Sequence, residues 1–148
     1  MPLILVISSC SNTKYLKSSE SLLVANSLNL KGELNASEKD DLKNSLTSSS
    51  VLLQHPNTKL LNIMWLKLGL YNQKHTEKKV GKIWNWLLID KNMEAPVIYD
   101  SMKTAQSAQN MVSYLNNQGF FHASVSHAQK IKSQKASVSY LVNTGRNF

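Results

Sequence analysis

The side chains that could take part in acid–base or metal chemistry are four histidines and a few carboxylates. The histidines are widely spaced along the chain, at His55, His75, His122 and His127. No two of them have the i, i+4 spacing that puts a pair of metal ligands on one helix face. Asp40 and Asp41 are adjacent, and neighbouring helical residues do not face one another. We therefore predict surface histidines, no enzyme and no cofactor, because catalysis needs groups that converge.

The single cysteine follows a short apolar run near the N-terminus. Leu3–Ile7 is entirely apolar, Ser8 and Ser9 are small, and Cys10 comes next. A secretory signal has an apolar segment followed by small residues at its cleavage site. Ile7–Cys10 resembles the bacterial lipobox, which implies that residues 1–10 are a signal and that Cys10 carries the lipid. The alternative interpretation is a buried first strand that ends beside an unreactive thiol.

Composition predicts a folded, basic protein with one domain. The 148 residues are 42% hydrophobic and 18% charged, and the formal net charge is +8. The lysines are spread along the chain and Arg146 is the only arginine, whereas nucleic-acid readers concentrate basic residues on one face. We interpret the charge as a solvated surface and expect no nucleic acid as a partner. A basic adaptor that binds anionic lipid or another protein remains the alternative.

The first third of the chain predicts one strand and one helix. Residues 11–21 are polar and are expected to form a tether. Leu22–Leu30 is rich in β-formers with partial alternation, which predicts a strand. Ser37 is the expected N-cap of a helix that ends near Leu46, with the acidic Asp40 three residues further on.

Residues 51–96 are predicted to be a helical insertion. Two groups of apolar residues within it, at 60–68 and 83–88, have helical spacing. Trp65 and Trp84 lie on these apolar stripes and are expected to pack inside. Trp86 lies off its stripe, so we predict that it is an exposed contact residue. Pro96 restricts the preceding residue to extended geometry and ends the segment.

The last third predicts a capped helix and a hairpin. Asp100, Ser101 and Thr104 can cap a helix that runs to about Gln118, with Gly119 as its left-handed C-terminal cap. Apolar and polar residues then alternate over two expected strands, 121–129 and 136–142, joined by a polar turn. The order strand, helix, insertion, helix, strand, strand predicts an α+β fold.

One stretch resembles a known family. In Tyr114–Val125 a helix ends at a glycine, an aromatic pair follows, and a strand begins with Ala-x-Val. This resembles a POTRA domain, and Tyr140–Gly145 resembles the strand and glycine that close one. Pro96–Ser101 and the stretch from Trp65 to Asn72 resemble the lipoprotein branch of the BamA/TamA outer-membrane assembly superfamily, whose first POTRA domain carries a helical insertion. The resemblance covers roughly residues 22–148.

The resemblance implies a fold, a place and an activity. The fold would be one POTRA-like domain over residues 22–148, with a small mixed three-stranded sheet. The place would be the outer membrane, with a lipid anchor at Cys10 and the domain facing the periplasm. The activity would be docking of other assembly subunits and binding of unfolded outer-membrane protein segments by β-augmentation. Family members continue through further POTRA domains into a barrel, so we expect a fragment or a truncated product that binds but does not insert proteins.

Strand addition needs an exposed sheet edge, and two strands are expected to supply one. The first is the strand at 22–30, and the second is the strand that begins at 121. The side chains expected to contact a client segment are Leu22, Val24, Phe121, Ala123 and Val125.

Overall fold

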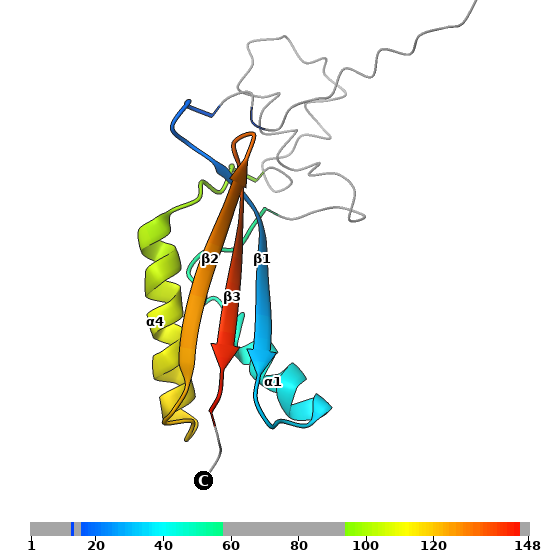
Figure 1. Ribbon diagram of the computed structural model, residues 1–148. Coiled ribbons are helices and arrows are strands. Elements are labelled where there is room, and N and C mark those ends of the chain that lie inside the picture. The colour runs from blue at the N-terminus through cyan, green and yellow to red at the C-terminus, as the bar shows by residue number, and fades with distance from the viewer. Residues whose placement is uncertain (1–12, 14–15, 58–93, 146–148) are drawn as a thin grey trace, which may run out of the picture.

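The computed structural model describes residues 13, 16–57 and 94–145, and its fold is α+β (Figure 1). The elements are β1 (Leu22–Lys31), α1 (Ala36–Leu46), α4 (Ser101–Asn117), β2 (Ser124–Lys132) and β3 (Lys135–Asn143). The strands form one sheet in the order β1-β3-β2. β3 pairs in parallel with β1 and antiparallel with β2. The predicted α+β class and the small mixed three-stranded sheet are confirmed.

The hydrophobic core lies between one face of the sheet and the two helices. Alternate residues of the central strand β3 are buried, whereas the residues between them lie on the opposite, uncovered face. Leu42 and Leu46 of α1, and Met111 and Leu115 of α4, complete the core. The residues of β3 that face it are Ala136, Val138, Tyr140 and Val142.

A register shift in β1 brings its apolar residues to the core. Leu22 and Leu23 are both fully buried although they are consecutive. Because strand side chains alternate, an uninterrupted strand would put Leu23 and Leu28 on opposite faces. The register shifts between Leu23 and Ala25, and this bulge lets Leu28 pack against the core as well.

Local capping groups set the bounds of α1. Its N-cap is Asn35, whose side chain accepts a hydrogen bond from the Glu38 N–H at 2.8 Å. The Glu38 carboxylate in turn accepts from the Asn35 N–H at 3.0 Å, which completes a capping box. The prediction that Ser37 caps this helix was therefore wrong by two residues. Asn35 is the N-cap, and Glu38 rather than Asp40 is the acid of its capping box.

The capping of α4 agrees with the sequence prediction. Asp100 is the N-cap and accepts hydrogen bonds from the N–H groups of Met102 and Lys103. At the other end, the Phe120 N–H bonds to the Leu115 carbonyl and Gly119 has a φ of 93°. These bonds form a Schellman motif, in which a glycine at the left-handed position ends the helix.

The turn after α4 delays the start of the next strand. The Ala123 N–H donates to the Phe120 carbonyl at 3.0 Å, and β2 begins at Ser124. The predicted strand start at Phe121 was therefore three residues too early. The hairpin turn that follows is also tight, because only Ser133 and Gln134 lie between the two strands.

The predicted boundaries of the tether and the insertion also change. The described part of the tether forms turns, and the Ser21 carbonyl accepts a hydrogen bond from Tyr99. Val51 and Leu52 are buried in the core, and residues 51–57 and 94–96 are not helical. The helical insertion at 51–96 therefore includes too much at both ends, while 58–93 lies outside the described residues. Within the described ranges, no helix is both long and apolar enough to cross a membrane.

Candidate docking edge

Both outer strands of the sheet could in principle receive another strand, but the edge of β1 is partly covered. The Leu23 N–H donates to the Val97 carbonyl at 2.8 Å, and an antiparallel bridge joins Leu22 to Ile98. Further along, the Asn26 side-chain amide donates to the Gln54 carbonyl at 2.6 Å. The first half of the β1 edge is therefore occupied by the segments that flank the insertion.

The edge of β2 is more open. Within the part of the chain that the structure describes, β2 pairs with β3 alone. All its side chains except Val125 are exposed, including those on the face that points towards the helices. α4 packs beside β2 (Figure 1), and the strand extends past it to the hairpin turn. An exposed edge strand offers a row of backbone N–H and C=O groups to an incoming segment.

The predicted contact residues fall in different environments. Leu22 is fully buried, and its N–H donates to the Gln134 carbonyl at 2.8 Å, so its side chain does not face a client. Val24 lies at the bulge, within the covered half of β1. Phe121 is 74% exposed but precedes β2, and Ala123 lies in the same turn, packed against the core.

Val125 is the one predicted contact residue that lies within the open strand. It sits opposite Val142 and packs against the core, so its backbone rather than its side chain belongs to the docking edge. Two other predicted site residues, Cys10 and Trp86, lie outside the described residues. Of the side chains predicted to contact a client segment, only Val125 therefore lies within β2, and the binding of a client there stays a prediction.

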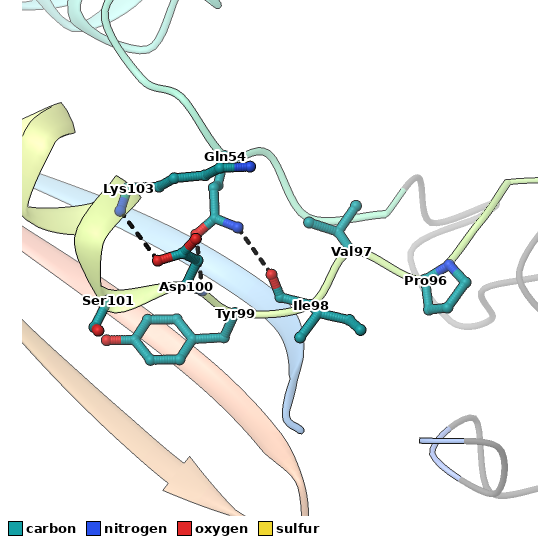
Figure 2. A pocket seen from close by; sticks show the side chains of 8 residues that line it. All are labelled: Gln54, Pro96, Val97, Ile98, Tyr99, Asp100, Ser101 and Lys103. Carbon is teal, nitrogen blue, oxygen red and sulfur yellow. Dashed lines mark hydrogen bonds between the residues drawn. The ribbon is translucent and has the colours of Figure 1, made fainter. Parts of the chain in front are cut away.

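Two buried amide side chains, which sequence reasoning missed, hold the segments on either side of the insertion together. Gln54 Nε2 donates to the Ile98 carbonyl at 2.8 Å, and Gln54 Oε1 accepts from the Asp100 N–H at 3.1 Å (Figure 2). Asn57 Nδ2 donates to the Ala95 carbonyl at 2.7 Å, as the second amide of the pair. Gln54 follows the apolar run Val51–Leu53, but nothing in the neighbouring sequence identifies the backbone groups that it binds.

A shallow groove lies beside this junction, lined by Gln54 and by residues 96–101 and 103 (Figure 2). The Gln54 amide and the Asp100 carboxylate that line it already bond to backbone groups of the protein. These two side chains therefore hold the segments around the groove together. Among the described residues, no three His, Cys, Asp or Glu side chains come together as a metal site.

A small cluster of hydroxyl groups from α4 and β3 is buried in the core. The side chain of Tyr140 is almost fully buried and interacts with Ser107 and Thr104. Burial raises the pKa of Tyr140, and the two hydroxyl groups offset part of that rise. The neighbouring Tyr99 hydroxyl is buried without a hydrogen-bond partner among the described residues. These groups lie in the core and away from the docking edge.

The comparisons with known proteins add no assignment to this geometry. No family model, curated protein or solved structure matches the chain. The POTRA resemblance thus rests on the residues quoted for it.

Proposed function

We propose that this chain is a POTRA-like docking module of an outer-membrane assembly factor of the BamA/TamA kind. In this proposal it faces the periplasm, anchored through Cys10, and receives extended segments of unfolded outer-membrane proteins. The observation that carries the proposal is the open outer edge of β2. The order of elements and the mixed sheet support it, because they agree with what the resemblance implied.

Strand addition at β2 would work through the backbone. Alternate residues of an edge strand direct their N–H and C=O groups away from the sheet, where a second strand can pair with them. Ser124, Ser126 and Ala128 have small side chains and share the face of the sheet that the helices leave uncovered. Such small side chains impose little selectivity on the side chains of a client segment. This suits a module that binds many different sequences.

The lysines of β2 would keep this open edge from pairing with a second copy of itself. Lys130 and Lys132 lie near the end of the strand, and both are exposed. Edge strands of natural proteins often carry lysine for this purpose, since two such edges repel one another. A client segment without excess positive charge meets no such barrier.

The proposal is tested by peptide binding to the purified chain. Isotope-labelled protein is titrated with an extended peptide from an outer-membrane protein strand, and amide shifts are followed by NMR. We expect the largest shifts in β2, with smaller ones in β3 and none in the covered half of β1. Absence of binding, or shifts centred on another element, would refute strand addition at this edge.

A pair of proline variants sharpens the test. Neighbouring N–H groups of an edge strand point alternately into the sheet and outwards, and proline removes one of them. The two variants are Ala128→Pro and Gln129→Pro, and one of them loses an N–H that points away from β3. That variant is expected to fold normally and to lose peptide binding. The other loses a bond to β3 and is expected to be destabilised. A folded variant that still binds as the wild type contradicts the proposal.

A further inference from the structure

Four of the residues of β2 share a face of the sheet with the hydrophobic core. Directly opposite residues of an antiparallel pair lie on the same face, and the residues of β3 on its helix side are buried. The residues of β2 that lie opposite them are Val125, His127, Gln129 and Ile131. We call these four residues the helix-side row.

The helices cover only the beginning of the helix-side row. Val125 packs against the core, whereas the other three residues are exposed, and Ile131 is 52% exposed. The ring of His127 lies near that of Tyr140, with centroids 6.4 Å apart and planes tilted by 44°. Among the described residues no strand lies beyond β2. The rows of side chains that cross the core therefore end at β2, where a further strand could continue them.

The helix α4 adds a second, partly apolar surface beside this row. One flank of α4 is held against residues 51–53, on the β1 side of the sheet, by the side chains of Ser107 and Asn110. Helical geometry puts Ala105 and Val112 on the other flank, towards β2. Both are half-buried. Because α4 packs beside β2 (Figure 1), a strand added to β2 would lie next to this flank.

The opposite face of β2 is polar and basic. The residues that lie on it are Ser124, Ser126, Ala128, Lys130 and Lys132, and all are exposed. None of the three strands contains an aspartate or glutamate. Polar or acidic side chains of an added strand fit this face, whereas apolar ones would stay in water there.

We infer that the β2 edge selects client segments in which apolar and polar side chains alternate, and that it binds them in one facing. The apolar side chains lie beside the helix-side row and the flank of α4, and the polar or acidic ones lie beside the serines and lysines. Strands of outer-membrane barrels have this alternation. The inference rests on the proposed function and adds a selectivity that backbone pairing alone does not supply.

The test compares two peptides that have the same composition and the same length as β2. In one, valine alternates with serine and glutamate, and in the other the same residues stand in adjacent pairs, so that each face is mixed. Binding of each labelled peptide to the full chain is measured by fluorescence anisotropy. We expect the alternating peptide to bind about tenfold more tightly, since each cross-strand side-chain pair contributes about a two- to fivefold factor.

The outcomes separate this inference from the proposed function. Equal affinities of the two peptides would overturn the inference and leave strand addition at β2 intact. If neither peptide binds, both the inference and the proposed function are lost. Tighter binding of the alternating peptide without amide shifts in β2 would also overturn the inference, because the selectivity would then come from another site.

Matched variants locate the face that receives the apolar side chains. Ile131→Ser in the helix-side row and Ala105→Glu on the flank of α4 should each weaken the alternating peptide about threefold or more. Leu141→Ser makes the first change on the uncovered face of β3, and Ser113→Glu makes the second on the solvent side of α4. Both controls should bind as the wild type does. Ile131 is exposed, so its variant tests the facing even if Ala105→Glu fails to fold. Equal weakening in the variants and their controls would contradict the facing.

Discussion

The side chain of Asn57 and the backbone of Val97, forty positions apart in the chain, are hydrogen-bonded to each other. The Val97 N–H donates to Asn57 Oδ1 at 2.9 Å, and Asn57 is only 3% exposed. The Val97 carbonyl in turn accepts a hydrogen bond from the Leu23 N–H. The bond therefore connects the end of the insertion to the covered edge of β1.

Replacing Asn57 should weaken the whole domain. In Asn57→Ala the Val97 N–H and the Ala95 carbonyl both lose a partner, and each of these part-buried hydrogen bonds contributes about 1 kcal/mol. We expect the free energy of unfolding to fall by about 2 kcal/mol, measured by urea denaturation. In Asn44→Ala, at an exposed position of α1, the free energy of unfolding should fall by less than half of that amount. Equal losses in both variants would contradict the role given to Asn57.

Two glycines should respond differently to alanine. At Gly119 the φ of 93° disfavours a side chain, but a Cβ there meets nothing within 4 Å. Gly119→Ala should therefore cost about 1 kcal/mol, the strain of the left-handed position alone. At Gly32 an added Cβ would collide with the Thr144 hydroxyl, and Thr144 is buried. Gly32→Ala should be clearly the less stable of the two in thermal unfolding.

The hairpin turn should become more stable with a better-suited residue. Ser133 has a φ of 50°, and asparagine tolerates this conformation better than serine. Ser133→Asn should raise the free energy of unfolding by about 0.5 kcal/mol, whereas Ser133→Val should lower it by about 1 kcal/mol. Denaturant midpoints check both values. A change of the same sign in the two variants would show that backbone strain is not what decides stability here.

Stability should fall at alkaline pH because of Tyr140. Burial raises the pKa of its hydroxyl in the folded state above the ordinary value of about 10. As pH rises past that ordinary value, the unfolded chain loses its proton first, so unfolding becomes more favourable. The contribution is complete below about pH 10 and is lost as pH rises through the folded pKa. Urea midpoints from about pH 9 to about pH 11 measure the effect, and Tyr140→Phe should remove it.

The features that could be predicted from the sequence are those fixed by neighbouring residues. The Asp100 and Gly119 caps act within a few positions of themselves, and the alternation in β3 shows directly which residues are buried. The start of β2 was harder to predict, because polar and apolar side chains already alternate from Phe121, inside the turn that precedes the strand. Periodicity does not separate such a turn from a strand.

Contacts between distant segments could not be predicted from local sequence patterns. Gln54 and Asn57 bond to backbone groups 38 to 46 positions away, and nothing near either residue points to those partners. The buried face of α4 shows the same limit. The polar Thr104 and Ser107 are buried, and their hydroxyls bond to carbonyls one turn back, whereas the apolar Ala105 and Val112 on the same helix are only half-buried.

The central strand of the sheet is also the last strand to be synthesised. β1 pairs with β3 and not with β2, so no two strands can join until residues 135–143 are available. Contacts between segments so far apart in sequence form slowly. A growing chain that has reached Lys132 therefore holds helices and an unpaired β1, but no sheet. Assembly of this sheet therefore waits for β3, which leaves a window in which β1 and β2 are both unpaired.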